Sequence, residues 1–398
     1  MSINKTRVVI ALSGGVDSSV AAYLLKKKGY DVIGIFMKNW HDESVTVSKE
    51  CPWLEDSYDA MIVSEKLAIP FQTIDLSDEY QTRIVDYMFD EYEKGNTPNP
   101  DVLCNREIKF DVFLKVALDL GADFIATGHY CRVEKIKDND KNIFRLLEGL
   151  DQNKDQSYFL CQLSQNQLSK TLFPIGELTK KEVRLIAKEQ GLITAEKKDS
   201  QGLCFIGKVK LPDFLQQKLK QKNGKIVKVS SKNKMYVNVD TTNHSIDNLL
   251  SISSSYNYNL NDGEYIGNHS GAHFFTVGQR KGLAVGGTKE PLFVLKTDIV
   301  KNIIYVGEGK NHPGLFRKVL FIKSEDLHLL RKDKFLNKEN IFKLKARIRY
   351  RQPLQDASLL IIGDGAFLIF DKKQSAITKG QFAVWYKNQE LLGSGIIN

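Results

Sequence analysis

The residue types best suited to chemistry lie in three short segments, and the first of them is rich in glycine. Residues 8–12 form an apolar run, residues 13–18 read SGGVDS, and a periodic apolar pattern follows at once. This order predicts a buried strand, a tight loop and a helix that ends near Gly29. Adjacent glycines bring bare backbone N–H groups close to a ligand, and the helix N-terminus adds partial positive charge. The loop therefore suits a phosphate group.

Side chains around these glycines can add further contacts. Ser13, Ser18 and Ser19 offer hydroxyl donors, and Asp17 could help to hold a divalent cation. No lysine follows the glycines, so the segment is not the Gly-x-x-x-x-Gly-Lys-Ser/Thr phosphate loop. It resembles instead the SGGxDS loop of the ATP pyrophosphatase group, whose members adenylate a substrate and release pyrophosphate. The alternative is a glycine-rich turn that binds nothing.

The second segment, residues 97–105, places a carboxylate three residues ahead of a thiol. Two prolines stiffen the loop ahead of Asp101 and Cys104. If a helix starts here, both side chains lie on one face, and the helix N-terminus favours the thiolate. The alternative is a helix cap followed by a buried core cysteine.

The third segment, residues 198–207, carries Cys204 between a polar, glycine-containing loop and a short apolar run. A strand cysteine facing the core is again the alternative. Together, Cys104 and Cys204 could pass sulfur as a persulfide and then a disulfide. The five cysteines form no C-x-x-C pair, which argues against a disulfide framework and a zinc ribbon. Structural roles are predicted for Cys51, Cys131 and Cys161.

Composition and charge limit the classes of protein that fit. The 398 residues are 42% hydrophobic and 26% charged, and no apolar run approaches the roughly 20 residues that a membrane span needs. The first residues lack the apolar core of a signal peptide, so the cytoplasm is the expected location, without membrane contact. A net charge of +9 permits a polyanionic partner such as RNA.

The first two hundred residues alternate predicted strands and helices. Strands buried on both faces are expected at 32–36, 71–74 and 124–127, with helices at 56–67, 79–93 and 110–120. This alternation predicts an α/β fold with a doubly wound, mostly parallel sheet and ligand sites at the carboxyl ends of its strands. A hairpin is expected over 132–147, a capping box at Thr179 and Glu182, and a short helix over 212–219.

The second half has a different character. Residues 229–262 are rich in Ser, Asn and Tyr with no clear helix, which predicts an extended β insertion or a partly disordered arm. Short alternating strands are expected at 293–296, 302–306, 343–350, 358–370 and 382–392, typical of a small antiparallel barrel. The expected domains are therefore 1–207 for catalysis, 208–288 as a small central domain and 289–398 as a C-terminal β-barrel.

The chain resembles the tRNA-specific 2-thiouridylase family, whose members thiolate the wobble uridine of certain tRNAs. The matching segments are 11–19, 36–40, 97–110, 126–130, 153–160, 198–207, 276–283 and 349–352, in family order over nearly the whole chain. Between Gly224 and about Gly267 the chain is longer than the compact central domain of the family, which puts in doubt the shape of that domain and its tRNA contacts.

The resemblance implies a role for each matched residue. ATP would be held by Ala11, Leu12, Ser13, Gly14, Gly15, Val16, Asp17, Ser18 and Met37, with Gly128 supporting the adenine end. Asn99, Pro100 and Asp101 would lie against the target base, with Asp101 assisting proton transfer. Cys204 would carry the persulfide and finish disulfide-bonded to Cys104. His129, Lys154, Asp155, Gln156, Arg349, Tyr350 and Gln352 would contact tRNA.

The implied cofactors are ATP and Mg²⁺, and the implied partners are the tRNA anticodon stem-loop and a persulfide-carrying sulfur donor protein, with the chain itself a monomer. An iron–sulfur cluster on Asp101, Cys104 and Cys204 stays open as an alternative to the persulfide. Two other functions also stay open. One is an ATP pyrophosphatase that makes an amide or amidine on a small molecule, and the other is a nucleotide-regulated RNA-binding protein.

Several residues implied to contact tRNA could instead have ordinary structural roles. His129 could cap a helix or bond to backbone, and Lys154-Asp155-Gln156 could be an ordinary helix start with Asp155 near the cap. Arg347, Arg349 and Arg351 follow a period of two, which predicts three cations on one face of a strand. A solvated charged face is the usual explanation. Tyr350 would then point to the opposite face, into the core or onto a nucleotide.

Overall fold

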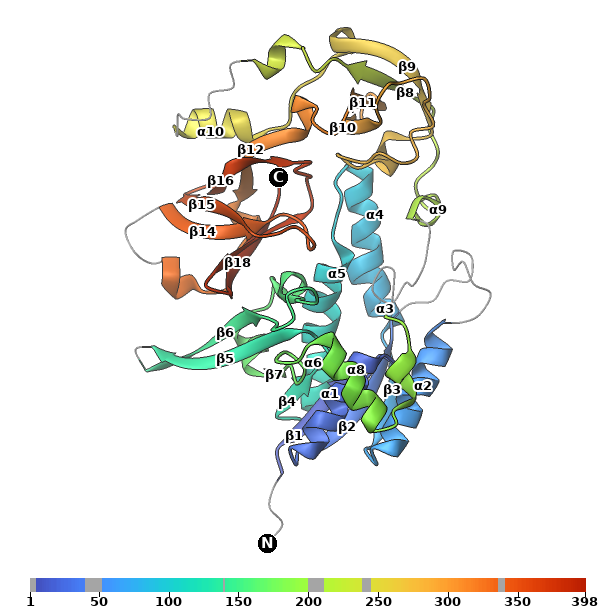
Figure 1. The fold of residues 1–398 in the computed structure, drawn as a ribbon, viewed down its shortest axis with the longest axis vertical. Helices are drawn as coiled ribbons and strands as arrows, with labels where there is room; N and C mark the ends of the chain where they lie inside the picture. Colours follow the sequence, from blue (N-terminus) through green and yellow to red (C-terminus); the bar gives the residue numbers. More distant parts are fainter. Residues whose placement is uncertain (1–4, 40–51, 139, 200–210, 238–244, 336–340) are drawn as a thin grey trace. The chain divides into compact units, whose positions relative to one another are not determined.

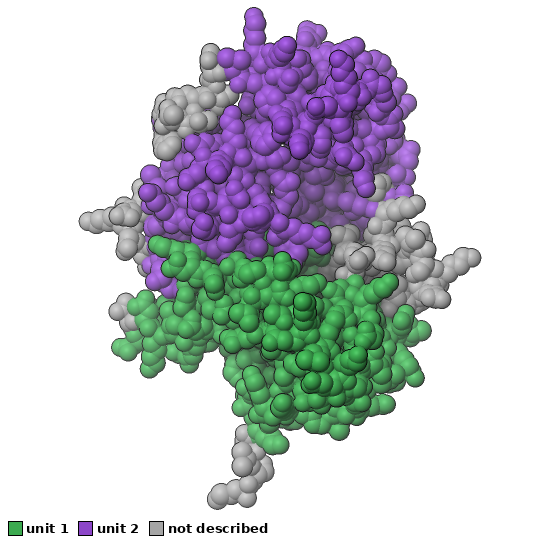
Figure 2. Space-filling view, viewed as in Figure 1, with its two compact units in different colours: residues 1–86, 100–210, 387–392 green, residues 87–99, 211–386, 393–398 purple. Residues whose placement is uncertain are grey.

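The computed structural model describes residues 5–39, 52–138, 140–199, 211–237, 245–335 and 341–398 (Figure 1). The chain divides into two compact units, coloured separately in Figure 2. Unit 1 comprises residues 1–86, 100–210 and 387–392, and unit 2 comprises 87–99, 211–386 and 393–398. Cys51 and Cys204, for which a structural and a catalytic role were expected, lie outside the described residues.

Unit 1 is built on a five-stranded sheet in the order β3-β2-β1-β4-β7. Its strands are β1 (Arg7–Ala11), β2 (Asp31–Lys38), β3 (Phe71–Asp75), β4 (Phe124–Ala126) and β7 (Thr171–Leu172). Every pairing between them is parallel, which confirms the expected open α/β sheet. Burial on both faces holds for β1 but not for β3, whose residues stay partly or fully exposed. The difference arises because β3 is the edge strand.

The strand order reverses beside β1. From β1 the chain builds β2 and β3 on one side, and it then crosses to place β4 and β7 on the other. At such a switch point, two loops leave neighbouring strand ends in opposite directions and open a crevice for a ligand. The glycine-rich loop follows β1, and Gly128 follows β4. Topology therefore brings together two segments that are more than a hundred residues apart.

The helices of the first 200 residues largely follow the predictions. They are α1 (Val16–Lys27), α2 (Pro52–Lys66), α3 (Ser77–Tyr80), α4 (Asp86–Glu93), α5 (Pro100–Leu103), α6 (Phe113–Asp119), α7 (Gln165–Ser169) and α8 (Lys180–Glu189). Wider π-helical turns join α3 to α4 and α5 to α6, at Gln81–Val85 and Cys104–Val112. The helix expected from residue 110 thus begins ten residues earlier, at Pro100, because proline suits the first helical position.

The hairpin expected over 132–147 is present as β5 (Cys131–Asp138) and β6 (Lys141–Glu148). Within unit 1, Leu146 and Leu147 of β6 also pair with Leu391 and Glu390 from the end of the chain. The single-turn helices of this unit are Ser157–Leu160 and Ile193–Glu196.

A four-stranded sheet in unit 2 has the order β10-β11-β8-β9. Its strands are β8 (Gly224–Val229), β9 (Gly263–His269), β10 (Leu292–Asp298) and β11 (Ile303–Glu308). The sequence analysis grouped β10 and β11 with the later strands, but β11 pairs in parallel with β8. Ile226, Val294 and Ile304 share one core across these strands, and such nonlocal packing leaves no trace in local alternation.

The polar segment 229–262 contains a helix, so the expectation of none was wrong. Helix α10 (Ile246–Ser253) begins at Ser245, whose hydroxyl accepts the backbone N–H of Asn248. Leu249 of α10 is buried against Val319 and Phe367 of later strands. Packing from a distant part of unit 2 thus stabilises a helix whose composition alone is unfavourable. Residues 238–244 of this segment lie outside the described residues.

The remaining strands of unit 2 pair antiparallel in the order β12-β16-β15-β14-β17. The strands after β11 are β12 (Phe316–Lys323), β13 (Leu327–Leu329), β14 (Ile341–Arg347), β15 (Gln355–Ile362), β16 (Gly365–Ser375), β17 (Phe382–Lys387) and β18 (Glu390–Ile396). Two predicted strands are each two strands in the structure, because turns interrupt them at residues 363–364 and 388–389. The short helices of this unit are α9 (Leu211–Leu215), Lys234–Tyr236, Leu260–Asp262, Ala272–Phe274, Pro313–Leu315, Ser324–Asp326 and Lys332–Phe335.

The strand predicted over 343–350 ends early, at Arg347. Arg347 is buried and donates to the Tyr386 hydroxyl at 2.7 Å, while Arg349 and Arg351 follow in an exposed turn. The expected face of three arginines is therefore wrong, since a period of two requires a continuous strand. Among the residues that the structure describes, no helix is long and apolar enough to cross a membrane.

The capping box predicted for α8 is present and gives a test of its contribution. The Thr179 hydroxyl accepts the backbone N–H of Glu182 at 3.3 Å, and Glu182 accepts the backbone N–H of Thr179 at 2.7 Å. We expect Thr179→Ala to lower the free energy of unfolding by about 1 kcal/mol and Tm by about 2–4 °C. Thr179→Ser keeps the hydroxyl and should stay near wild type in the same thermal scan; equal losses in both variants would contradict the cap.

Candidate functional site

The glycine-rich loop turns sharply between β1 and α1, and Gly14 makes the turn possible. Gly14 has a φ of +70°, and a Cβ at this position would lie 2.1 Å from the backbone oxygen of Asp56 in α2. No other residue type fits that space or adopts that backbone angle without strain. The loop is fixed to the sheet by the backbone N–H of Leu12, which donates to Ile35 at 2.8 Å.

The serine hydroxyls of the loop are mostly used within it. Ser18 and Ser19 both donate to the backbone oxygen of Gly15, at 3.1 and 2.8 Å. Ser19 also accepts a bond from Thr194 at 3.0 Å. The sequence analysis expected these hydroxyls to face a ligand, whereas Ser18 and Ser19 are buried and brace the loop. Ser13 is exposed, and its backbone N–H donates to Ser18 Oγ at 3.2 Å.

Gly128, which follows β4, packs directly on the loop. A Cβ on Gly128 would lie 2.7 Å from the backbone nitrogen of Ser18. The backbone of the turn after β4 therefore lies directly against the backbone of the loop. Among the other residues implied to hold ATP, Ala11, Leu12, Val16 and Met37 are buried beneath the loop or in β2.

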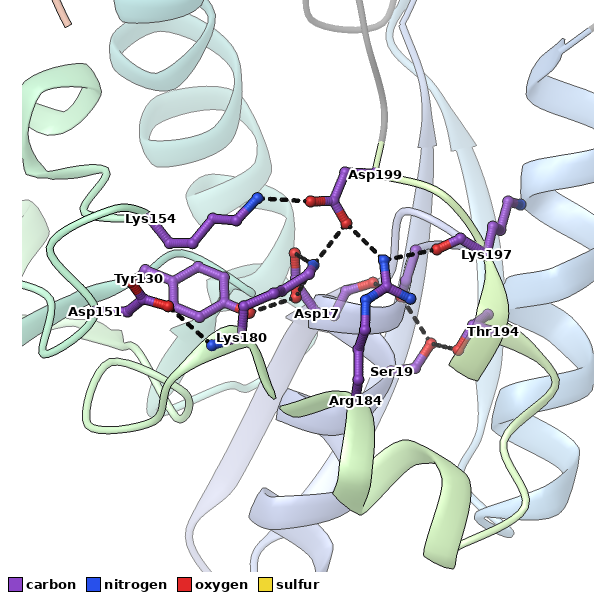
Figure 3. A network of polar contacts seen from close by, with 12 residues as sticks. Asp17, Ser19, Tyr130, Asp151, Lys154, Lys180, Arg184, Thr194, Lys197 and Asp199 are labelled. Atoms are coloured by element: carbon purple, nitrogen blue, oxygen red, sulfur yellow. Dashed lines mark hydrogen bonds and ion pairs between the residues drawn. The ribbon is translucent and has the colours of Figure 1, made fainter. Parts of the chain in front are cut away.

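Asp17 in the loop is held by two partners from distant parts of unit 1 (Figure 3). Lys180 Nζ, at the first position of α8, lies 2.7 and 2.8 Å from its two carboxylate oxygens. The Tyr130 hydroxyl donates to the same carboxylate at 2.7 Å. Burial, followed by the adjacent Asp17 charge, raises the pKa of Tyr130, so its proton stays in place as a donor.

In the same cluster, the Asp199 carboxylate forms ion pairs with three cationic side chains (Figure 3). Lys154 Nζ lies 2.7 Å from one carboxylate oxygen, and Lys180 Nζ and Arg184 Nη2 lie 2.8 and 3.0 Å from the other. Partial burial raises the pKa of Asp199, but the bonds from Lys154 and Lys180 outweigh it and lower the pKa to about 2. The carboxylate is therefore ionised at neutral pH.

The arrangement does not form a metal site by itself. Among the described residues, no group of three His, Cys, Asp or Glu side chains could hold a metal ion. Asp17, the expected cation ligand, is already engaged by Lys180 and Tyr130. A Mg²⁺ ion normally keeps one or two carboxylates and substrate phosphates as ligands, so this set does not fit a resident ion.

The second segment folds as the sequence predicts. Asp101 lies in the first turn of α5, and Cys104 follows three residues later in the same continuous helix, so both share one face. Cys104 is fully buried, as are Cys131 and Cys161, for which structural roles were expected. Pro100 is buried in unit 1, and Asn99 belongs to unit 2.

His129, expected at a tRNA contact, lies inside unit 1. Its Nδ1 lies 2.7 Å from the Thr127 hydroxyl, and its ring lies about 6.1 Å from those of Phe110 and Phe173. Burial, followed by the charge of Lys109, lowers the pKa of His129 well below its usual value, so the ring is neutral. These contacts favour a structural reading, and contact with tRNA stays a prediction.

The side chains of residues 154–156 make three different kinds of contact. Asp155 is buried and accepts the backbone N–H groups of Gly149 and Ser157 at 3.1 and 3.0 Å, as expected of a residue near a helix cap. The Gln156 side chain accepts the backbone N–H of Tyr130 at 3.0 Å. The Lys154 ammonium group lies 2.7 Å from a carboxylate oxygen of Asp199.

The residues expected near tRNA in unit 2 lie in the turn after β14. The exposed Arg349 bonds to the backbone oxygen of Ser375. The Gln352 side chain accepts the N–H of Ile348 at 2.9 Å and donates to Gln374 at 2.7 Å, and Tyr350 is half-buried. The structure thus places Asp17 with Lys154 in unit 1 and Arg349, Tyr350 and Gln352 together in unit 2.

Sequence reasoning missed four members of the cluster around Asp17. Tyr130 and Asp199 lie in segments that match the family, but no role was expected for either, and Lys180 and Arg184 lie outside those segments. One signal was available, because the capping box fixes where α8 begins and so places Lys180 and Arg184 one turn apart. Their convergence on Asp199 depends on tertiary contacts.

Family models match three stretches of the chain. A model described as a tRNA methyl transferase HUP domain covers residues 6–208, one described as a tRNA methyl transferase PRC-barrel domain covers 245–308, and one described as an aminomethyltransferase beta-barrel domain covers 322–397. The parallel sheet falls within the first stretch, strands β9, β10 and β11 of the central sheet within the second, and strands β13 to β18 within the third.

Full-length relatives are named for a different activity from the methyl transfer in the descriptions of the family models. A tRNA-specific 2-thiouridylase MnmA from Christiangramia forsetii is 65% identical over 98% of this chain and 100% of its own. One from Flavobacterium johnsoniae is 62% identical over the same shares. A solved 4-thiouridine synthetase–RNA complex with bound ATP aligns over 53% of this chain and 50% of its own, at 18% identity and a TM-score of 0.35, too distant to support an argument.

Close packing at Gly128 gives a test of the loop geometry. We expect Gly128→Ala to destabilise unit 1 by about 1–3 kcal/mol, because its methyl group must displace the backbone of Ser18. Gly363→Ala is the matched control, since a Cβ at Gly363 meets nothing within 4 Å. Thermal unfolding of both variants measures the difference, and equal values would show that the two turns do not pack as described.

Proposed function

This chain belongs to the tRNA-specific 2-thiouridylase family, and we propose that it uses ATP to replace the 2-oxygen of the tRNA wobble uridine with sulfur. The identity of 65% over essentially the full length of a curated relative is the observation that carries this proposal. It makes the chain a tRNA-uridine 2-sulfurtransferase rather than a methyltransferase, although the matching family models carry the latter description. A tRNA substrate fits a cytoplasmic enzyme.

ATP would bind at the carboxyl ends of β1 and β4. Gly15 is partly exposed, and a Cβ there would meet only the Ser13 hydroxyl, at 3.5 Å. Asp17 and Lys180 form an ion pair beside it. Met37 in β2 and Gly128 after β4 flank the same strand ends and would support the nucleoside. Mg²⁺ would arrive with the phosphates of ATP, and we assign no protein ligand and no step to it.

Adenylation solves the main chemical difficulty of the reaction. A uracil carbonyl oxygen is a poor leaving group, so sulfur cannot displace it directly. In the proposed first step the 2-oxygen attacks the α-phosphate of ATP, the bond to the β-phosphate breaks, and pyrophosphate leaves. The base then carries AMP on its oxygen, which is a good leaving group. To reach the site, the wobble base must leave the anticodon stack.

Sulfur would then come from a persulfide on Cys204, loaded by a donor protein. Its terminal sulfur attacks carbon 2 of the base, and AMP leaves with the former 2-oxygen. Cys104 attacks the inner sulfur of Cys204, which frees the thiolated base and leaves a Cys104–Cys204 disulfide. In a second order of events Cys104 attacks first and releases hydrosulfide, which then attacks the base. Either route ends with the same disulfide, which a thiol reductant must reopen.

Asp101 is proposed to assist proton transfer at the base, together with Asn99 and Pro100 as contacts. Its place one helical turn ahead of Cys104 puts a carboxylate and the proposed thiol on one face of a helix. Contacts with the anticodon stem-loop are proposed for Arg349, Tyr350 and Gln352, whose turn is at least partly exposed. His129 and Asp155 are buried and Gln156 is partly buried, and contact of these three with tRNA stays a prediction. We also propose that the chain is a monomer.

The cysteines give the decisive test. We expect Cys204→Ala and Cys104→Ala to abolish formation of 2-thiouridine while ATP and tRNA still bind, because only sulfur transfer needs the thiols. Cys161→Ala is the matched control, since this buried cysteine has no role in the proposed chemistry. Nucleoside mass spectrometry after incubation with unmodified tRNA, ATP, Mg²⁺ and a sulfide or persulfide source measures the product.

Other outcomes of that assay identify the competing functions. Full activity in the Cys104→Ala and Cys204→Ala variants would overturn the persulfide route. Cleavage of ATP to AMP and pyrophosphate without sulfur incorporation would favour an amide- or amidine-forming enzyme that acts on a small molecule. Bound tRNA with no pyrophosphate release would favour an RNA-binding protein.

Salt dependence tests the contact with RNA separately. Because phosphate contacts release counterions, we expect tRNA affinity to fall about tenfold or more between about 50 and 200 mM salt. Binding of adenosine, which has no phosphate, should change little over the same range. Fluorescence anisotropy of labelled tRNA measures the effect, and a flat response would argue against electrostatic recognition.

A further inference from the structure

Three cationic side chains converge on the carboxylate of Asp199, and one of them, Lys180, is shared with Asp17. Lys154, Lys180 and Arg184 all lie within 3.0 Å of its two oxygens. These cations come from two parts of unit 1, the turn before residue 157 and the first two turns of α8 (Figure 3). A surface carboxylate usually pairs with one cation, and such a pair contributes little. Three convergent donors are typical of sites for phosphate-type anions.

The same cluster touches the glycine-rich loop. Lys180 bonds to Asp17 of that loop as well as to Asp199, so it lies between the loop and the other two cations. Its side chain is 12% exposed, whereas Asp199 is 37% exposed. Asp199 can therefore return to water with a modest loss of interactions, while Lys180 is held in place. Asp17 is 31% exposed but also accepts the Tyr130 hydroxyl, so Asp199 is the anion that can be exchanged.

We propose that Asp199 occupies the place of a polyphosphate, and that the β- and γ-phosphates of ATP, or pyrophosphate, displace it from Lys154, Lys180 and Arg184. The inference rests on the proposed use of ATP and adds a second phosphate contact surface beside the glycine-rich loop. Polyphosphate brings several negative charges and many acceptor oxygens, so it satisfies all three cations better than one carboxylate does. Arg184 would donate from Nη2, the atom that now lies 3.0 Å from Asp199, while Nη1 and Nη2 keep their bonds to the backbone oxygens of Ala195 and Lys197.

The exchange assigns Lys154 to a nucleotide phosphate rather than to tRNA. It also gives Asp199 a role as a competing anion that lowers apparent affinity for the polyphosphate in the nucleotide-free protein. Asp199 stands five residues before Cys204 in the sequence. The residue that yields to the polyphosphate thus belongs to the same stretch of chain as the proposed sulfur-carrying cysteine.

Pyrophosphate binding to the full chain tests the exchange. We expect Asp199→Asn to bind inorganic pyrophosphate about three- to tenfold more tightly than wild type by calorimetry, because the neutral side chain no longer competes. Asp356→Asn is the matched control: it removes the same charge from an exposed pair with Lys345 in unit 2, and should leave the affinity unchanged. Adenosine affinity should be equal in all three proteins, because adenosine has no phosphate.

A second pair of variants keeps the test decisive if Asp199→Asn unfolds. Lys154→Gln and Arg184→Gln should each weaken pyrophosphate binding about tenfold, with adenosine affinity close to wild type. Equal pyrophosphate affinity in these variants, Asp199→Asn and wild type would overturn the exchange. A change in tRNA affinity with unchanged pyrophosphate affinity would also overturn it, because the cations would then serve RNA phosphodiesters.

The same measurements distinguish a wrong exchange model from a wrong proposed function. If wild type forms 2-thiouridine but the Asp199, Lys154 and Arg184 variants bind pyrophosphate as wild type does, only the exchange is wrong. If wild type neither binds ATP nor forms 2-thiouridine, the proposed function has failed, and with it the assignment of the cluster to ATP.

Discussion

The contact between two backbone turns at the centre of the parallel sheet is the constraint on which unit 1 depends. Gly14 after β1 has no room for a side chain against Asp56, and Gly128 after β4 has none against Ser18. Glycine at position 128 lets the turn after β4 lie against the loop, and glycine at position 14 lets the loop lie against α2. These two contacts fix the loop at the carboxyl end of β1, the end of a parallel sheet where ligands bind.

The ion pairs of Lys180 lie beside these contacts. Lys180 is mostly buried, and an ammonium group removed from water needs carboxylate partners. Asp17 and Asp199 provide them, one from the loop and one from the stretch that leads toward Cys204. Because a capping box fixes the start of α8, the backbone geometry determines where this charge lies. A feature of helix stability thus positions the central cation of the candidate site.

Unit 2 shows how packing overrides composition. The segment after β8 is polar enough to suggest a loose arm, yet its helix α10 is anchored by Leu249. Tyr236, Tyr258 and Tyr305 pack near one another on the central sheet, and the Tyr236 and Tyr258 hydroxyls lie 2.9 Å apart. Burial, then interactions with the neighbouring Tyr236, raises the pKa of Tyr258. The insertion is therefore an integral part of the described fold of unit 2.

The sequence by itself determined those features that depend on neighbours in the chain. Hydrophobic periodicity was enough to predict the strand–loop–helix of residues 7–27 and the parallel strands. Residue types and spacing were enough to predict the capping box and the shared face of Asp101 and Cys104. The resemblance then supplied the chemistry that these local features could not specify.

Only the tertiary structure decided which side chains meet. Asp17 and Lys180 are 163 residues apart, and no local pattern encodes their contact. The burial of His129 and Arg347, the exposure of β3 and the pairing of β11 with β8 follow from the position of each element among the others. Local propensity sets the elements, but long-range packing decides which faces are buried and which charges converge.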